Sequence, residues 1–391
     1  MKSNWITATI DDVCTVVTDG AHNSPKSVEQ GHYMASVKDF TEFGFDFSNC
    51  KQIGEEDYEK LRNQGRVPEK NDILVGKDGA RYFEDIIIYK QDERPALLSS
   101  IAILRADCRK ITPEFLYYTL KSPAVRKDVR DNYGSGSAIP RIVLKDFKRM
   151  PFSFPSIEEQ RKITNLCSAI DAKIQINNAI NENLEQQAKA LYQQMFIENT
   201  CPDWIEGSLR DIADITMGQS PSGSSYNEDG IGTIFFQGRA EFSFRFPTIR
   251  LYTTEPKRMA YANDILMSVR APVGDLNIAH TDCCIGRGLA AIHSKTNHQS
   301  FVLYTMFSLR KQLDVFNGEG TVFGSINRNS LNDMQILIPS DETIEEFEKI
   351  VAPMDAAIRN NYDEICRLQA VRDSLLPRLM SGELDVSSLD I

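Results

Sequence analysis

The strongest constraint on this chain is that it repeats itself once. Segments of its first half return in the same order in its second half, at a spacing of about 190 residues. The matching pairs are Trp5–Val13 with Trp204–Ile212, Asn71–Leu74 with Asn263–Leu266, Phe115–Thr119 with Phe301–Thr305, and Ile157–Glu159 with Ile344–Glu346. Solenoid repeats are only about 20–50 residues long, so this period indicates a duplicated domain. Two similar units can present two similar surfaces, as a symmetric dimer does, and such a pair suits a two-part target.

Length and composition are those of a globular protein with more than one domain. The 391 residues predict two or three domains, and a hydrophobic share of 41% is ordinary. There is no run of 18 apolar residues, and Met1–Trp5 lacks an apolar signal core, so we expect a cytoplasmic protein that does not contact a membrane. The eight cysteines form no C-x-x-C pair and the five histidines show no ligand spacing, so neither a metal site nor a disulfide framework is indicated.

The net charge of −11 is unevenly distributed along the chain. Residues 1–155 carry 23 basic and 23 acidic side chains, and residues 204–339 carry 12 and 13. Most of the excess acid lies in residues 156–203, with a net charge of −3, and in residues 340–391, with −7. Nucleic-acid binding needs a local basic face rather than a basic total, so the two neutral halves stay candidates for it. The alternative is an ordinary acidic cytosolic protein.

Each half is followed by a segment with a helical period. Apolar residues and asparagines recur at alternating steps of three and four over residues 170–195 and 344–375. Sustained spacing of this kind is typical of a coiled-coil seam, and the alternative is a helix that only flanks a core. At about 1.5 Å per residue, helices over residues 157–197 and 342–376 would be ~60 Å and ~50 Å long.

Prolines and asparagines modify this helical pattern. We expect Pro353 to kink or restart the second helix, and Pro377 and Gly382 to end it. An asparagine buried in a seam lowers stability but fixes register and orientation. The residues predicted to pair the two helices as an antiparallel coiled coil are Ile170, Ile174, Asn177, Asn181, Leu184, Leu191, Ile358, Asn361, Ile365 and Leu368.

The two globular halves mix strand-like with helix-like stretches. Residues 86–89, 98–104 and 265–269 resemble strands, whereas residues 115–120 and 301–309 predict helices. Because strands and helices do not alternate regularly, we predict an α+β fold rather than a doubly wound sheet. The predicted order is a globular domain over residues 1–155, a spacer helix over 156–200, a second globular domain over 201–340, and a second spacer helix with a tail over 341–391.

Three polar loops that contain glycine occur at matching places in both halves. They pair residues 20–25 with 218–223, 76–81 with 268–274, and 133–141 with 317–325. Glycine lets a backbone approach a ligand, Ser and Asn form short hydrogen bonds, and Arg or Lys can reach phosphates or guanine. Any one of these loops is as readily a simple turn, but the recurrence of all three favours a shared binding face.

The sequence lacks the common catalytic signatures. It contains no Walker A loop, no HExxH, no GxSxG and no Asn-Pro-Pro-Tyr methyltransferase motif. Residues Ile285–Gly288 are too short for a dinucleotide-binding loop. We therefore predict that the chain is not itself an enzyme.

Four stretches of this duplicated chain form a recognisable set. They are Met217–Pro221 with Tyr226–Asn227 and Phe236–Gly238, Ser268–Gly274 with Ile285–Gly288, Met150–Gln160, and Leu375–Leu384. Along its whole length the chain resembles the specificity subunit of type I restriction–modification systems. The first two stretches resemble parts of that family's target recognition domains, the third its proline-rich approach to the first helix, and the fourth its C-terminal signature.

The resemblance implies two target recognition domains, each reading one half of an interrupted double-stranded DNA sequence. The helices would dock two methyltransferase subunits and, through them, the translocating endonuclease subunits. This chain would hold no cofactor, and S-adenosylmethionine, ATP and Mg would be bound by the partner subunits. The whole complex would be an adenine-specific DNA methyltransferase and an ATP-dependent endonuclease directed against phage DNA.

The resemblance also suggests which side chains face DNA. Arg and Gln can read base edges, and the remaining polar side chains are better suited to phosphates. Acidic helices avoid phosphates and can meet a complementary partner surface. The expected DNA-binding residues are Lys77, Arg81, Arg141 and Lys145 in the first half, and Gln219, Ser220, Arg270, Arg287, Asn327 and Arg328 in the second.

One departure from the repeat leaves a question for the structure. Gln160 in the first copy is matched by Phe347 in the second, so a shared role for that glutamine is in doubt. Two other functions stay open at this point. One is a DNA-reading subunit of a type II-like restriction and methylation enzyme, and the other is a coiled-coil scaffold that does not bind DNA.

Overall fold

The chain folds into two compact units, each built from one globular half and one end of each long helix. The computed structural model describes residues 5–79, 81–134, 140–318, 324–384 and 386. Unit 1 comprises Met1–Asn178 and Asp363–Ile391, and unit 2 comprises Ala179–Tyr362. Each unit has its own hydrophobic cores. None of the helices in the described part of the chain is long and apolar enough to cross a membrane.

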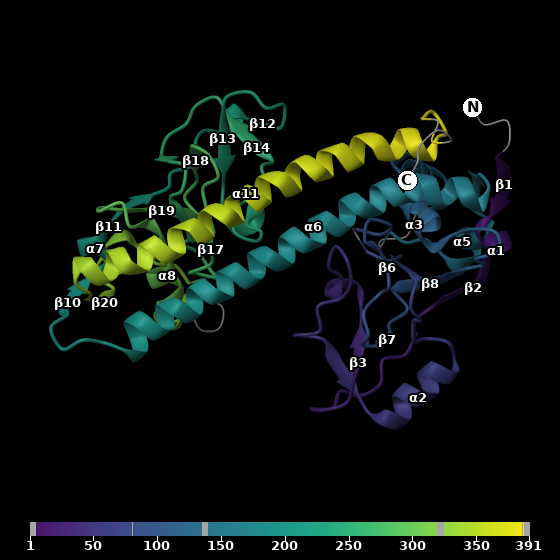
Figure 1. Cartoon of the computed structure of the whole chain (residues 1–391), viewed down its shortest axis with the longest axis horizontal. Coiled ribbons are helices and arrows are strands. Elements are labelled where there is room, and N and C mark those ends of the chain that lie inside the picture. Colours follow the sequence, from purple (N-terminus) through teal and green to yellow (C-terminus); the bar gives the residue numbers. More distant parts are fainter. Residues whose placement is uncertain (1–4, 80, 135–139, 319–323, 385, 387–391) are drawn as a thin grey trace. The chain divides into compact units, whose positions relative to one another are not determined.

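The centre of unit 1 is a four-stranded antiparallel sheet (Figure 1). Its order is β2 (Cys14–Asp19), β8 (Ile101–Ala106), β5 (Ile73–Gly76) and β6 (Ile86–Ile88). A second sheet has the order β4 (Lys51–Ile53), β3 (His32–Ala35) and β7 (Ala96–Leu97), and a third pairs β1 (Ile6–Thr9) with β9 (Pro151–Phe154).

Short helices cover the sheets of unit 1. They are α1 (Ile10–Val13), α2 (Glu55–Asn63), α3 (Pro113–Lys121), α4 (Pro123–Asp128) and α5 (Leu144–Arg149). Helix α3 begins at the N-cap Thr112, whose hydroxyl accepts from the Phe115 N–H, and has proline in its first turn. Residues Phe115–Leu120 are all buried, so this helix lies at the heart of the core. The prediction of a strand over residues 98–104 was partly wrong, because β8 begins only at Ile101.

Unit 2 repeats this plan. Its central antiparallel sheet has the order β11 (Ala213–Met217), β19 (Leu289–Ser294), β16 (Ile265–Ser268) and β17 (Leu276–Ile278). The second sheet has the order β12 (Tyr226–Asn227), β14 (Leu251–Thr253), β13 (Thr233–Phe236), β18 (Cys283–Ile285) and β15 (Met259–Ala260), and the third pairs β10 (Ile205–Ser208) with β20 (Gln335–Ile338). The helices are α7 (Leu209–Ile212), α8 (Gln299–Ser308), α9 (Arg310–Asp314) and α10 (Arg328–Asn332). The α+β class and the internal repeat are therefore confirmed.

The repeated Asn-Asp pair has a structural reason. Asn71 and Asn263 both adopt left-handed backbone, with φ of 72° and 76°, which asparagine tolerates better than most residues. The following Asp72 and Asp264 are buried, and each side chain accepts a hydrogen bond from the backbone N–H three residues earlier. The pair thus forms the tight turn that starts β5 in unit 1 and β16 in unit 2.

The two long helices are continuous. Helix α6 spans Ile157–Tyr192 and helix α11 spans Asp341–Met380. The expectation that Pro377 ends the helix was wrong, and the helix does not restart at Pro353, because α11 runs through both prolines. Each proline removes one N–H donor, but the packing of the helix on its unit compensates for that loss. Gly382, at a φ of 68°, lies beyond the end of the helix.

The helices pair along the predicted seam within each unit. In unit 1, Ile170 and Ile174 of α6 cluster with Ile365 of α11, and Leu368 packs against them. In unit 2, the buried Asn181 of α6 accepts a hydrogen bond from Asn361 of α11. Residue numbers increase along α6 in the direction in which they decrease along α11, so the two helices pair as an antiparallel coiled coil, as predicted. Of the remaining predicted residues, Asn177 and Ile358 are buried, whereas Leu184 and Leu191 are half-buried.

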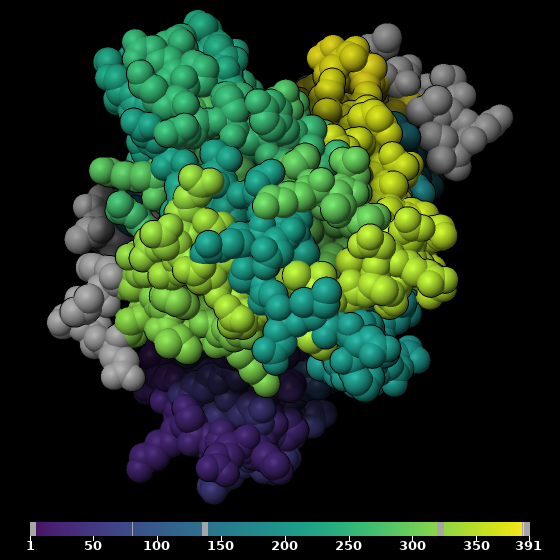
Figure 2. All heavy atoms as spheres, turned by 90° about the vertical axis from the view of Figure 1, so that its left-hand side faces the viewer, coloured from purple at the N-terminus to yellow at the C-terminus, as the bar shows by residue number. Residues whose placement is uncertain are grey.

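The globular half of unit 2 is packed onto both helices. Tyr192 at the end of α6 lies in one core with Phe301 of α8 and Phe347 of α11. Figure 2 views this unit from the end where α11 begins, and the teal residues of α6 lie there beside the yellow-green residues of α11. The helices are therefore part of the domain core and not merely connectors.

The mismatch between Gln160 and Phe347 is explained by a shift of one residue. Gln160 is fully buried, accepts from the Thr112 N–H at 2.8 Å and donates to the Lys110 carbonyl oxygen at 3.0 Å, which ties α6 to the start of α3. In unit 2 Phe347 fills the core, and the next residue makes the polar contact. The Glu348 carboxylate accepts from the Ser300 N–H at 3.0 Å, at the start of α8.

Candidate nucleic-acid interface

Four loop segments of unit 2 are held together by backbone hydrogen bonds. Gly218 N–H donates to the Leu289 carbonyl oxygen at 2.9 Å, which joins the first loop to the turn before β19. Val269 N–H donates to the Gly288 carbonyl oxygen at 3.0 Å. Ala271 N–H donates to the Gly324 carbonyl oxygen, also at 3.0 Å. The loops that the sequence singled out therefore meet at one edge of the central sheet.

Unit 1 contains the same three bonds at equivalent positions, and a fourth bond is common to both units. Gly20 N–H donates to the Ile101 carbonyl oxygen at 3.1 Å and Lys77 N–H to the Ser100 carbonyl oxygen at 2.8 Å. Gly79 N–H donates to the Pro140 carbonyl oxygen at 3.0 Å. In the fourth bond, Ile142 N–H donates to the Lys77 carbonyl oxygen. Its equivalent in unit 2 runs from Ile326 N–H to the Val269 carbonyl oxygen. The two halves therefore share one loop framework. Residues 80, 135–139 and 319–323 of these loops lie outside the described residues.

Glycine is required where these loops approach each other. A Cβ on Gly218 would collide with the carbonyl oxygen of Gly286, and a Cβ on Gly20 would collide with that of Leu97. Both collisions involve backbone atoms, which cannot move aside as a flexible side chain can. The glycine that begins each loop is therefore explained by close packing of the framework.

The side chains on this shared framework differ in charge. Single β-bridges pair Asp78 with Arg141 in unit 1 and Arg270 with Ser325 in unit 2. Asp78 therefore stands where unit 2 has Arg270, and Arg141 stands where it has Ser325. The two surfaces have the same backbone geometry but opposite placement of the cation, so they present different hydrogen-bonding groups to a ligand.

Lys77 does not face outward as expected. It is 7% exposed, and its Nζ lies 3.6 Å from Asp19 Oδ2 and 3.3 Å from Asp78 Oδ2. Its counterpart in unit 2 is Val269, which is also buried. The framework places this position inside the domain, and Lys77 is tolerated there because two carboxylates compensate its charge. The prediction that Lys77 contacts DNA does not agree with this environment.

The other candidates of unit 1 lie at the surface. Arg141 and Lys145 are exposed. Arg81 is also exposed, and its Nη2 donates to Asp85 Oδ1 at 2.7 Å. That bond raises the pKa of the Arg81 guanidinium, so the side chain stays charged. Arg81 and Arg141 are thus exposed in the loops of unit 1, and Lys145 is exposed in helix α5, which follows the last of these loops.

Unit 2 brings most of its candidates to the same loop cluster. Ser220 Oγ accepts from the backbone N–H of Arg287 at 3.3 Å, which joins the loops that carry Gln219 and Arg287. Gln219, Arg270 and Arg287 have exposed side chains, and Ser220 is half-buried. These four residues come from three segments that are distant in sequence.

The last two candidates begin helix α10. Asn327 and Arg328 are exposed, and the Asn327 side chain is the N-cap, accepting from the Ser330 N–H at 3.0 Å. One lone pair of that oxygen is thereby used, and the Asn327 amide nitrogen keeps its two N–H donors for a ligand. No group of three or more His, Cys, Asp and Glu side chains within the described residues is arranged to hold a metal ion.

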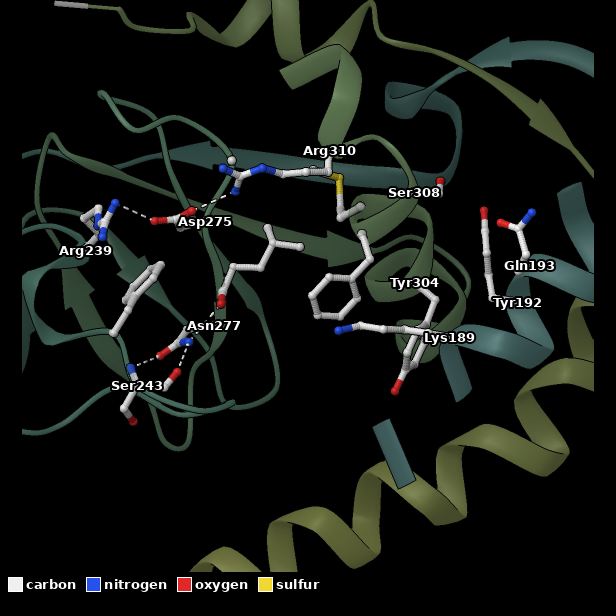
Figure 3. A pocket seen from close by; sticks show the side chains of 15 residues that line it. Lys189, Tyr192, Gln193, Arg239, Ser243, Asp275, Asn277, Tyr304, Ser308 and Arg310 are labelled. Atoms are coloured by element: carbon white, nitrogen blue, oxygen red, sulfur yellow. Dashed lines mark hydrogen bonds and ion pairs between the residues drawn. The ribbon is translucent and has the colours of Figure 1, made fainter. Parts of the chain in front are cut away.

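Figure 3 shows a cavity of about 600 Å³ in unit 2, and its lining includes Gly274, the last residue of the loop that carries Arg270. Asp275, which directly follows the loop of Arg270, lies between Arg239 and Arg310 at 2.7 Å from each. Its hydrogen bond holds the pKa of Arg310 above its ordinary value. Sequence reasoning missed these three residues because they come from separate segments, and no local pattern connects them.

The protein therefore has two similar α+β domains and two long helices, and its candidate binding loops recur in both domains. Comparison with known sequences identifies the family. The profile of the type I restriction modification DNA specificity domain matches residues 2–186 and 202–365. The chain belongs to this family, and the resemblance derived from its motifs is confirmed.

Individual relatives agree with this assignment. The chain is 28% identical to the putative type I restriction enzyme MjaX specificity subunit of Methanocaldococcus jannaschii, over 99% of this chain and 95% of that protein. It is 22% identical to the type I restriction enzyme HindI specificity subunit of Haemophilus influenzae, over 81% and 87% of the two chains. The crystal structure of a type I restriction–modification S subunit from M. genitalium has the same fold, with a TM-score of 0.57, 17% identity and 96% coverage of both chains.

Family membership defines the general role of the chain. Specificity subunits are non-catalytic, bind DNA and assemble with the other restriction–modification subunits. This chain therefore supplies DNA sequence specificity to a type I complex.

Proposed function

We propose that the chain reads an interrupted DNA target, with one half-site bound by the loop cluster of each unit. The shared loop framework is the observation that carries this proposal. The same four backbone hydrogen bonds recur in both units, whereas the side chains on them differ, as Asp78 and Arg270 do. Two loop clusters with the same backbone framework but different side chains are suited to bind two half-sites of different sequence.

The charge distribution supports DNA binding by the globular halves and docking of partner subunits by the helices. Residues 340–391 carry 12 acidic and 5 basic side chains, whereas residues 1–155 are neutral overall. An acidic helix repels phosphates and attracts a partner with a basic surface. The helices would therefore dock two methyltransferase subunits, and restriction subunits would join through these. The complex would act in the cytoplasm, where the cell's DNA lies.

The chemistry would belong to the partner subunits. S-adenosylmethionine would be bound by the methyltransferase, and ATP and Mg²⁺ by the endonuclease and translocase. The reaction directed by this chain would be methylation of an adenine in each half-site and, on unmodified DNA, ATP-dependent cleavage.

A reconstitution experiment tests this function. The purified chain, the methyltransferase subunit of the same system, and the two together are incubated with DNA and S-adenosylmethionine that carries a labelled methyl group. We expect label in the DNA only when both proteins are present. Methyl transfer by this chain alone, or equal sequence-specific transfer by the methyltransferase alone, would contradict the proposal.

A matched pair of arginine variants controls for loss of charge. Arg270→Ala removes a cation from the loop cluster. Arg109→Ala removes a cation from unit 1, beyond the end of strand β8 that lies away from the loops of that unit. Arg109 is exposed there and bound to Asp107. We expect the first change to reduce methylation of the target and the second to leave it unchanged.

A further inference from the structure

Arg245 has an unusual environment for an arginine. Its backbone is left-handed, with a φ of 65°, and the residue is only 5% exposed. A non-glycine residue keeps such a backbone only where its surroundings enforce it, and a buried guanidinium needs ionic or hydrogen-bonding partners. Both features point to a strong constraint on this residue.

The partners of Arg245 lie on the two long helices. Its Nη1 donates to Glu185 Oε1 of α6 at 3.1 Å, and its Nη2 bonds to Asp355 Oδ1 of α11. The hydroxyl of Tyr304 in α8 donates to the same Asp355 oxygen at 3.0 Å. One side chain from a loop of the globular half thus joins both helices of unit 2. Arginine suits this role because its planar fork can bind two carboxylates in fixed directions.

The residue after Arg245 extends the contact along α11. Phe246 is buried, and its ring centroid lies 4.7 Å from that of Tyr362. From the helix side, Arg359 Nη1 donates to Asn263 Oδ1 at 2.7 Å. Asp355, Arg359 and Tyr362 are spaced by four and three residues, so they share one face of α11.

The other end of this segment reaches the loop cluster. Ser243 N–H donates to Asn277 Oδ1 at 3.2 Å, and Asn277 Nδ2 donates back to the Ser243 carbonyl oxygen at 2.7 Å. Arg239 binds Asp275, the residue directly after the loop of Arg270 (Figure 3). Residues 239–246 therefore form a strap from the edge of the candidate DNA-binding loops to the two helices.

Unit 1 makes a comparable connection in which helix α11 supplies the arginine. There the arginine is on the helix, since Arg372 of α11 is 8% exposed and binds Asp171 of α6 at 2.7 Å. The loop of the globular half supplies the acid, because Arg372 Nη1 also lies 3.4 Å from Glu42 Oε1. Each globular half is thus joined to its helix pair by a buried arginine, but the arginine comes from opposite sides.

We propose that Arg245 is a positioning residue for DNA recognition. By binding Glu185 and Asp355 together, it sets the angle between the second recognition domain and its two helix segments. That angle in turn determines the number of unread base pairs between the two half-sites. This inference rests on the proposed function, since it presupposes that unit 2 reads one half of an interrupted target.

The test uses the full chain in cells that carry the complete system. Arg245→Met removes the fork but keeps a long apolar stem, and Arg245→Lys keeps one charge. Arg210→Met is the matched control, because Arg210 lies in helix α7 outside the strap, and its side chain and that of its partner Asp333 are both exposed. The measurement is the methylation of every genomic copy of the two half-sites, sorted by the length of the gap between them.

A positioning role predicts a specific pattern. For Arg245→Met we expect both half-sites to keep their bases, while methylation at gaps one base pair longer or shorter rises at least tenfold relative to the native gap. Arg245→Lys should lie between this variant and the wild type, and Arg210→Met should match the wild type. A merely structural loss would lower methylation at all sites without changing the preferred gap. An Arg245→Met variant that methylates sites with the native gap only would overturn the inference.

Two further variants cover the case in which Arg245→Met does not fold. Glu185→Gln and Asp355→Asn each weaken one helix contact and keep the arginine in place. Relaxed gap selection in either supports the inference, and native gap selection in both overturns it. A wild-type chain that directed methylation to an uninterrupted site would instead refute the proposed function, and this result is distinct from either outcome for the variants.

Discussion

Asn361 of α11 donates a hydrogen bond from its Nδ2 to the Oδ1 of Asn181 on α6 at 2.8 Å. The two asparagines meet across the seam of unit 2, where Asn181 is 1% exposed. Unit 1 uses a different pair, because Asn177 Nδ2 donates to Glu364 Oε2 at 2.8 Å. A polar pair in an apolar seam costs stability but penalises every register in which the partners do not meet.

Removal of one seam asparagine should destabilise unit 2. In Asn361→Ala the buried Asn181 amide loses its partner, and we expect the free energy of unfolding to fall by about 1–3 kcal/mol. Urea denaturation followed by circular dichroism measures this loss, and Asn360→Ala, an exposed neighbour, should change it by less than about 0.5 kcal/mol. The double change of Asn181 and Asn361 to Leu should recover the lost stability. A double variant as unstable as the single one would show that the pair does not form in solution.

Arg270 and Lys77 lie in equivalent loops, but their substitution should affect different properties. Arg270→Ala, at an exposed position, should cost about 1–3 kcal/mol of binding to target DNA and leave stability unchanged. Lys77→Met should instead lower the free energy of unfolding by about 1–3 kcal/mol, because Asp19 and Asp78 lose their shared cation. Fluorescence anisotropy with the assembled complex and urea denaturation separate the two effects. Equal loss of DNA binding in two stable variants would restore Lys77 as a direct contact.

Glu348 should make the stability of unit 2 depend on pH. Burial raises the pKa of Glu348 above its ordinary value of 4.5, and the hydrogen bonds from Ser300 and Phe301 only partly offset this effect. The folded chain therefore holds this proton more tightly than the unfolded chain. The resulting stabilisation is complete below pH 4.5 and is lost as pH rises through the folded-state pKa.

The variant Glu348→Gln lacks this titration and makes this position neutral, as Gln160 is in unit 1. We expect its stability relative to the wild type to increase between pH 4.5 and neutral pH. Urea denaturation at several pH values gives the difference. A difference that is constant with pH would mean that Glu348 does not titrate abnormally.

The length of the paired helices should set the gap between half-sites. Because α6 and α11 pair in both units, a heptad must be inserted into both, for example after Ala179 and after Tyr362. Each helix then grows by ~10 Å at about 1.5 Å per residue, and the seam stays in phase. We expect a gap longer by about one to three base pairs, at roughly 3.4 Å per base pair. The methylated motif of the variant reports this length, and an active variant with an unchanged gap would contradict the role of the helices.

A heptad in α6 alone is the matched control for this insertion. Seven inserted residues would have no partner on α11, so every seam contact beyond them would be lost. We expect this variant to assemble poorly and to methylate little DNA.

Local patterns in the sequence predicted much of the fold. The repeat, the seam from Ile170 onward and the α+β class follow from periodicity, which reports on neighbours along the chain. Intrinsic propensity favoured a restart of the helix at Pro353, but the burial of Val351 and Ile358 in unit 2 keeps α11 helical there. Propensity is weak compared with a large buried face.

The candidate site was less accessible to sequence reasoning. Lys77 looked like a surface cation in the sequence, but its side chain is buried, as is its counterpart Val269 in unit 2. Arg245, Glu185 and Asp355 are brought together by tertiary packing alone, so no spacing along the chain connects them. Pairing of the repeats predicted where the loops lie, but not which of their side chains point outward.

Exchange of one recognition domain tests whether each unit reads one half-site. Residues 204–339 are replaced by the corresponding residues of a family member with a different known target, and the methylated motif is determined by sequencing DNA from cells with the complete system. The account predicts that one half of the motif changes to that of the donor, while the other half keeps its sequence. A change in both halves, or in neither, would contradict the assignment of one half-site to each unit.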